Sequence, residues 1–139
     1  MNQYTLTTYK PNQEYSGYHF FILNKGLNSG KPLKEPIPNC FVCSCNSETE
    51  RDFLYWFVFG LWQSKAFEPY LTGSVISFIR KKELSTVINQ GMEKLKVNEL
   101  KAKKNISAIQ KVEIYRLNIL KQIQLIGDLK KALIFEILN

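Results

Sequence analysis

Residues 40–62 read CFVCSCNSETERDFLYWFVFGLW and contain the change from strand to helix on which the fold depends. The first six residues are small, β-branched or aromatic and predict a strand, with odd-numbered side chains on one face and even-numbered ones on the other. Ser47, with Glu50 three residues later, forms a capping-box pattern, so we expect a helix from about residue 48 to 66. Because this helix is apolar nearly all round, it should be central to the core.

Three further segments have the composition of strands. Residues 4–9 alternate between β-branched or aromatic and other side chains, and residues 18–24 form a more continuous apolar run, as in a strand buried on both faces. Residues 73–80 are the fourth candidate. We therefore predict an α+β fold, in which a small mixed or antiparallel sheet of about four strands packs on the aromatic-rich helix.

Two long helices are predicted after the last of these strands, over about residues 82–103 and 106–138. In the second, repeated steps of three residues make the apolar stripe drift around the helix, which argues against a strict coiled-coil heptad. The stripe is also wider than one small sheet can cover, so we expect a partner helix or a second copy to pack on it. The predicted interface residues are Leu117, Leu120, Ile123, Ile126, Leu133 and Ile137.

Composition changes near residue 80. Residues 1–80 hold 16 of the 18 aromatic residues and a nearly balanced 7 basic and 6 acidic residues, whereas residues 81–139 hold 12 basic and 6 acidic ones. This predicts an α+β core domain in the first part and a basic amphipathic helical region in the second, as one compact unit or as a helical extension. The net charge of +7 favours nucleic acid or an acidic protein as partner, although solubility alone also explains it.

A long loop over residues 24–39 contains two Gly, three Pro and three Asn. Its segment GLNSGKP at residues 26–32 is not a P-loop, because three residues separate the glycines and Pro follows the Lys. Exposed amides and lysines here could bind a phosphate or another anion, and an ordered loop with solvated lysines is the alternative. The predicted anion- or nucleic-acid-binding residues, here and on the helices, are Lys25, Gly26, Gly30, Lys31, Lys34, Arg80, Lys81, Lys82, Lys101, Lys103 and Lys104.

No catalytic residue, metal site or cofactor is predicted. The spacing of Cys40, Cys43 and Cys45, with His19 as the one histidine, does not suit zinc, so we expect reduced, buried thiols. The N-terminus has no signal-peptide pattern, and the longest apolar run is about half a membrane span. We therefore expect a cytoplasmic protein without a membrane partner.

The stretches FFILNKGLNSGKP at residues 20–32 and GSVISFIR at residues 73–80 resemble a family of small uncharacterised bacterial proteins, often encoded on mobile elements in gut Bacteroidetes. The resemblance covers residues 19–80 and leaves out the helical region. It implies an accessory role in a plasmid, transposon or phage and carries over no catalytic residue.

The resulting hypothesis is a non-catalytic binding or accessory protein that engages nucleic acid or another anionic partner. The alternative is a protein–protein adaptor or assembly module that oligomerises through its C-terminal helices. An enzyme comes third, and a substrate-sized pocket at the loop of residues 26–30, lined by Arg80 and by Tyr or Trp side chains, would favour it.

Overall fold

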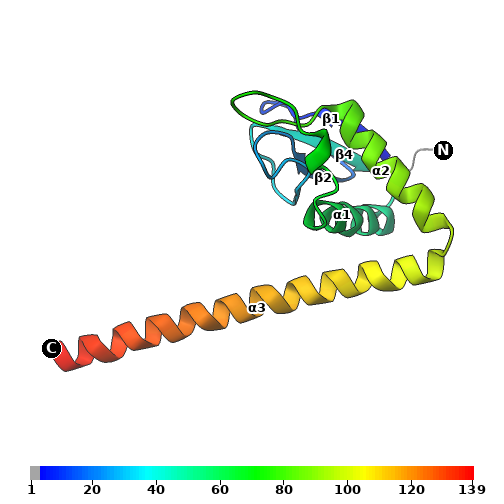
Figure 1. Cartoon of the computed structure of the whole chain (residues 1–139). Coiled ribbons are helices and arrows are strands. Elements are labelled where there is room, and N and C mark those ends of the chain that lie inside the picture. Colours follow the sequence, from blue (N-terminus) through cyan, green and yellow to red (C-terminus); the bar gives the residue numbers. More distant parts are fainter. Residues whose placement is uncertain (1–3) are drawn as a thin grey trace. The chain divides into compact units, whose positions relative to one another are not determined.

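The computed structural model describes residues 4–139 and has an α+β fold, as the sequence predicts (Figure 1). The elements are β1 (Tyr4–Thr8), β2 (Tyr18–Leu23), β3 (Pro32–Leu33), β4 (Cys40–Cys45), α1 (Glu48–Gln63), the 3-10 helix η1 (Glu68–Tyr70), α2 (Lys81–Lys96) and α3 (Glu99–Leu138). They form two compact units, which we call unit 1, ending at Ile106, and unit 2, Ser107–Asn139.

The sheet is antiparallel, with the strand order β1-β4-β2-β3. One of its faces belongs to the main core, which α1 and α2 also line, and the other face packs under the side chains of Tyr9, Tyr15 and Leu33. The central strands β2 and β4 are therefore buried on both faces, which accounts for their continuous apolar runs. The main-core side chains from these two strands are Phe20, Ile22, Phe41 and Cys43, and those of the second face are Phe21, Cys40 and Val42.

The predicted strand over residues 73–80 is wrong. Only Phe78 pairs there, in isolated bridges with Thr72 and Lys25, and Gly73 at φ 109° turns the chain into an exposed loop. Val75 and Ile76 point into solvent in this loop, so their apolar alternation does not mark a buried strand face. The fourth strand is the short β3, which lies inside the region predicted to be irregular.

Helix α1 begins where the capping box predicts. The Ser47 Oγ accepts a hydrogen bond from the Glu50 N–H at 3.2 Å, which satisfies a free helical amide. The helix ends at Gln63, a few residues before the predicted end, because Lys65 adopts a left-handed φ of 61°. The Lys65 N–H donates to the Trp62 carbonyl at 3.0 Å and the Ala66 N–H to the Leu61 carbonyl at 2.9 Å, which is a Schellman C-cap.

The break between the C-terminal helices lies at residues 97–98, whereas the sequence predicted it after residue 103. Asn98 causes it, because its side-chain Oδ1 accepts a hydrogen bond from the Lys101 N–H at 3.2 Å and so caps α3. Helix α2 is part of the core through Leu84, Val87 and Ile88. Unit 1 thus extends well beyond the compositional change near residue 80.

Candidate interaction surfaces

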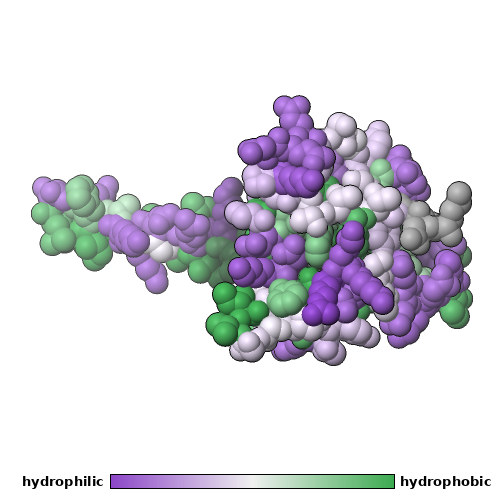
Figure 2. Space-filling view, turned by 90° about the horizontal axis from the view of Figure 1, so that it is seen from above, coloured by the Kyte–Doolittle hydropathy of each residue, from purple (hydrophilic) through white to green (hydrophobic). Residues whose placement is uncertain are grey.

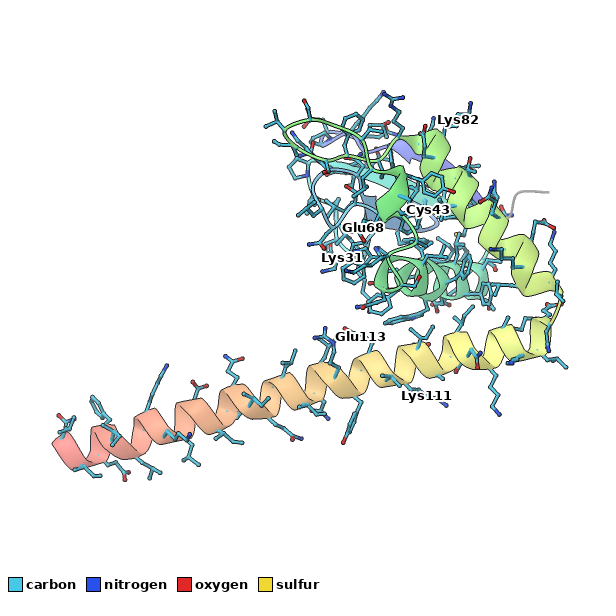
Figure 3. All side chains as sticks on the ribbon, in the orientation of Figure 1. Lys31, Cys43, Glu68, Lys82, Lys111 and Glu113 are labelled. Carbon is cyan, nitrogen blue, oxygen red and sulfur yellow. The ribbon has the colours of Figure 1, made fainter. Side chains whose placement is uncertain are left out.

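Unit 2 is a single helix, so its apolar side chains have no core within the unit. From Val112 to Leu138, fifteen large apolar side chains are each at least 39% exposed. They are interleaved with polar side chains along the visible surface of the helix and project from it all around (Figures 2 and 3). A lone helix in water gains nothing from such side chains, so this surface is suited to a partner.

One column of this helix is apolar at every position. Its members, Val112, Ile119, Ile126 and Leu133, follow one another at intervals of seven residues. We call these four and the apolar residues flanking them the apolar face. The flanking residues are Ile109, Tyr115, Ile123, Leu129 and Ile137. Since a straight helix drifts by about 20° per seven residues, such a column favours left-handed supercoiling around another helix.

The predicted interface residues divide between two sides of α3. Ile123, Ile126, Leu133 and Ile137 belong to the apolar face, and Leu120 lies at its edge. Leu117 lies on the opposite side from Ile126, because nine residues are about two and a half helical turns. The prediction missed Ile119, whose seven-residue spacing was the available signal.

The loop after β2 is brought against the segment that leads into α2. The Gly26 N–H donates to the Ser77 carbonyl at 2.6 Å and the Ile79 N–H to the Asn24 carbonyl at 2.9 Å. Lys25 and Arg80 therefore lie in neighbouring segments, as a shared binding site would require. Arg80 is the N-cap residue of α2, and Lys81 and Lys82 occupy its first turn.

Four amides of the loop, including those of both glycines, are not available to an anion. The Ser29 N–H donates to the Gly26 carbonyl at 3.2 Å, the Gly30 N–H to the Leu23 carbonyl at 2.7 Å, and the Lys31 N–H to the Asn28 carbonyl at 3.0 Å. The Gly26 amide is engaged as well. This hydrogen bonding removes Gly26 and Gly30 as amide donors from the predicted anion site and leaves the lysine side chains.

Two of those lysines lie over aromatic rings of α1. The Lys31 Nζ is 5.1 Å from the Trp62 ring centroid, and the Lys34 Nζ is 6.0 Å from that of Tyr55. Tyr55, Trp56, Phe59 and Trp62 form a row of edge-to-face and tilted ring contacts along the helix. Trp62 is partly buried and packs against the main core, as the sequence interpretation expected, and its spacing from Tyr55 places both residues on one side of the helix. The sequence interpretation missed that lysines of the loop lie over these two rings.

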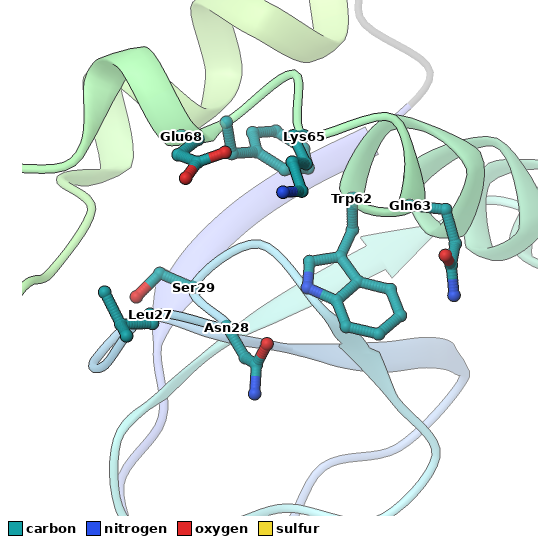
Figure 4. Close-up of a pocket in the computed structure, with 8 residues that line it drawn as sticks. Leu27, Asn28, Ser29, Trp62, Gln63, Lys65 and Glu68 are labelled. Atoms are coloured by element: carbon teal, nitrogen blue, oxygen red, sulfur yellow. The ribbon is translucent and has the colours of Figure 1, made fainter.

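A cavity of about 290 Å³ lies beside Trp62 (Figure 4). Its walls come from the loop after β2, the last turn of α1, the Schellman turn and η1. Ser29, which is 2% exposed, donates its hydroxyl hydrogen to the Gly26 carbonyl at 2.6 Å. The lining residues are Leu27, Asn28, Ser29, Trp62, Gln63, Lys65, Phe67 and Glu68.

The cavity lies at the loop where a substrate-sized pocket would favour an enzymatic function, and Trp62 lines it as expected, but Arg80 is not among its lining residues. Neither the Lys65 ammonium nor the Glu68 carboxylate is in an ion pair with another residue of the described chain. The cavity thus offers an indole, side-chain amides and two unpaired charges of opposite sign.

The lysines at the start of α3 do not act as one group. The Lys103 Nζ pairs with Glu99 at 2.8 Å, whereas Lys101 and Lys104 form no ion pair with any residue from 4 to 139. Lys101 and Lys104 are three residues apart and share a side of the helix, and Lys103 points elsewhere. Only two of the three predicted cations here are thus free to meet an anion together.

The cysteines are structural. Cys40 and Cys43 are buried in opposite faces of the sheet. Burial raises the pKa of the Cys40 thiol, and hydrogen bonding to Cys45 together with burial raises the pKa of Cys43. The same hydrogen bond lowers the pKa of Cys45. Over residues 4–139, no group of three or more His, Cys, Asp or Glu side chains is arranged to hold a metal ion.

Comparison with known proteins gives a family without an assigned activity. No curated protein matches the sequence. None of the helices within residues 4–139 is both long enough and apolar enough to cross a membrane. A family model described as a family of unknown function, DUF6943, matches residues 6–136, so the similarity includes the helical region that the resemblance over residues 19–80 left out. The chain therefore belongs to the DUF6943 family of unknown function.

Proposed function

We propose that this protein is an assembly module, in which unit 2 associates with unit 2 of a second copy. The observation that carries the proposal is the apolar face of α3, with its column of four apolar residues at seven-residue spacing. In this function, unit 2 forms the contact between the two copies, and unit 1 is the folded domain that each copy brings into the assembly.

The exposed apolar surface is large enough for a stable contact. Eight of the fifteen exposed large side chains belong to the apolar face, along a helical segment about 40 Å long. A standard protein interface buries roughly 800 Å² on each partner, and at about 25 cal/mol per Å² of apolar surface this amounts to many kcal/mol before the cost of association. Covering the apolar face would therefore stabilise a helix that has no packing of its own.

The seven-residue column favours a second copy over an unrelated partner. Helices with the same repeat can insert side chains of one into gaps of the other along their whole length. A second copy has this repeat by definition, and soluble oligomers are mostly symmetric homo-oligomers. Arg116 and Lys130 interrupt the flank of the apolar face, and polar residues at such positions restrict register and subunit number.

A matched pair of substitutions tests this proposal. Ile126 and Leu125 are adjacent and equally exposed, at 55% and 56%, but only Ile126 is in the column. We expect Ile126→Asp to give a monomer by light scattering coupled to size exclusion, with unchanged α+β circular dichroism per residue apart from α3. Leu125→Asp should keep the oligomer.

A wild-type monomer at about 100 μM would rule out self-association of useful affinity. Equal effects of the two substitutions would rule out the apolar face as the contact.

We propose binding of an anionic partner as a second function, because Lys31 has no carboxylate partner and lies against Trp62. An accessory role in a mobile element and a cytoplasmic location also remain proposals, and they suit an assembly module. Retention of the purified protein on a heparin column at about 0.3 M salt, lost in Lys31→Met, would support the anionic function.

A further inference from the structure

We infer that the cavity at Trp62 binds a nucleotide, with the base against the indole and the phosphate near Lys31 and Lys65. The inference does not depend on self-association, since every residue it uses lies in unit 1. It concerns a ligand, whereas the proposed assembly concerns the contact between copies.

The cavity offers what a base requires. Trp62 supplies a flat aromatic surface in its wall, on which a base of any sequence can stack (Figure 4). Asn28 and Gln63 add side-chain amides, each with donors and an acceptor, and no other residue from 4 to 139 takes a hydrogen bond from either. About 290 Å³ is at the lower end of ligand cavities, so the space suits a small group such as one base with its sugar.

The charged side chains around the cavity indicate where the phosphate of the nucleotide would bind. Lys31 is half-buried, and its ammonium lies 5.1 Å from the Trp62 ring centroid without a carboxylate partner in the described chain. Lys65 adds a second unpaired ammonium in the wall itself. Glu68, on η1, is the one carboxylate among the lining residues, and it repels a phosphate from its own side while accepting hydrogen bonds from an amino group of a base.

The walls are formed before any ligand arrives. The loop is held by its own backbone hydrogen bonds, and Gly30 packs so closely on Phe67 that a side chain has no room there. The Schellman turn fixes the backbone of Lys65. A preformed site loses little conformational entropy on binding, which favours a small ligand.

Two sources of this ligand share the same chemistry, a free mononucleotide and one residue of a single-stranded nucleic acid. Lys34 lies over Tyr55, which is nearer the start of α1 than Trp62 is, and it would contact the next phosphate of a single-stranded nucleic acid. The experiment therefore titrates the full-length protein with AMP, with UMP and with a fluorescein-labelled dT12 single strand. Binding is followed by isothermal titration calorimetry for the nucleotides, which does not depend on Trp62, and by fluorescence anisotropy for the strand.

Three variants distinguish binding in the cavity from a general attraction between a basic protein and an anion. Trp62→Leu should weaken binding about tenfold or more, because it removes the stacking surface. Lys65→Gly removes a lining ammonium at a left-handed φ that glycine prefers, so the fold is retained and binding should weaken about threefold to tenfold. Lys94→Met removes the same charge from an exposed lysine of α2 outside the cavity and should change binding less than twofold.

The outcomes distinguish the sources and test the site. Binding of AMP or UMP at affinity similar to that of dT12 per site assigns the cavity to a free nucleotide, and binding of dT12 at least about tenfold tighter assigns it to a single strand. Absence of binding by all three ligands at about 1 mM overturns the inference. Equal weakening by Lys65→Gly and Lys94→Met also overturns it, because the cavity would then have no part in binding.

Discussion

Gly30 and Gly26 are four residues apart in the same loop, but their surroundings differ. Both have a positive φ, 99° and 94°, which side chains other than glycine rarely adopt. A Cβ atom on Gly30 would overlap the ring of Phe67, which is fully buried, whereas a Cβ atom on Gly26 would meet nothing within 4 Å. Alanine substitution at Gly26 therefore measures backbone strain alone, whereas the same substitution at Gly30 measures strain together with steric overlap.

We predict that Gly30→Ala lowers the free energy of unfolding by about 2–4 kcal/mol, through strain and displacement of the Phe67 ring. Gly26→Ala should cost about 1 kcal/mol, through strain alone. Urea denaturation followed by tryptophan fluorescence measures both values. Equal losses in the two variants would mean that the Phe67 ring moves aside without cost.

The cysteines should differ in reactivity. Cys45 is partly exposed and has a lowered pKa, whereas Cys40 and Cys43 are buried with raised pKa values. Because thiolates are the reacting species, an aromatic disulfide reagent at pH 8 should modify one thiol rapidly in the native protein and all three after denaturation. Cys45→Ser should abolish the rapid phase. A rapid phase that persists in this variant would place the reactive thiol elsewhere.

Ionisation of the Tyr4 phenol should make the free energy of unfolding depend on pH at high pH. Its hydroxyl donates to the Asn89 Oδ1 at 2.9 Å and links β1 to α2, and burial raises its pKa. Since the folded state favours the protonated phenol, stability from Tyr4 is complete below about pH 10 and is lost as pH rises above that value.

We predict that Tyr4→Phe costs about 1 kcal/mol at pH 7, through the lost hydrogen bond, and that this difference from wild type shrinks above pH 10. Urea denaturation at pH 7, 9 and 10.5 tests this. The raised pKa of Cys40 acts on both proteins alike, so the comparison cancels it, whereas the negative charge of a Cys43 thiolate is one of the causes that raise the pKa of Tyr4. A constant difference across this range would contradict the role of Tyr4 ionisation.

Among the elements, α1 and α2 start in opposite ways. Ser47 caps α1 with its hydroxyl, and acidic residues occupy the first turn. Arg80 has the extended backbone of an N-cap residue but makes no side-chain cap, and Lys81 and Lys82 place two positive charges, against the single acidic residue Glu83, at the positive end of the helix dipole. The start of α2 is therefore not optimised for stability.

We predict that Arg80→Asp raises the free energy of unfolding by about 1 kcal/mol, by capping α2 and complementing its dipole. Ser47→Ala should lower it by about 1 kcal/mol. Thermal unfolding followed by circular dichroism should show midpoint shifts of a few degrees in opposite directions. A lower midpoint for Arg80→Asp would mean that the contact of Arg80 with the Phe78 ring outweighs the cap.

The success of prediction from sequence varied with how local the signal was. The start of α1 and the strand β4 follow from adjacent residues, through a capping box and a run of small, β-branched and aromatic side chains, and both were predicted. The strand at residues 73–80 was not formed, because Val75 and Ile76 point into solvent and only Ile79 joins the main core, and only tertiary structure decides that. Asn98 could have been recognised as a helix cap in the sequence. The apolar periodicity continues past it, however, so the helix break was predicted too late in the chain.

The candidate cavity could not be predicted from the sequence alone, because its walls come from segments that only the fold brings together. The loop lysines were named from the sequence, but Trp62, Lys65 and Glu68 join them only because α1 ends beside the loop. The predicted loop amides were lost for the same reason, since their partners Leu23 and Ser77 come from other segments. Composition indicated a basic region after residue 80, whereas the unpaired lysines next to aromatic rings lie before it.

For the whole molecule, assembly should be linked to stability. If the folded protein associates through unit 2, mass action raises the unfolding temperature with protein concentration. We predict a rise of a few degrees between about 2 and 200 μM for wild type, and none for Ile126→Asp. Differential scanning fluorimetry measures it. A midpoint that is independent of concentration in both proteins would contradict a linked assembly.

The strand order has a consequence for how the chain is made. β1 and β2 are not neighbours, since β4 lies between them and pairs with both. During synthesis, neither strand has its main partner until residues 40–45 have left the ribosome. Until then β1 is unpaired and β2 has only the short β3 beside it, and the single insertion of β4 completes the centre of the sheet at once.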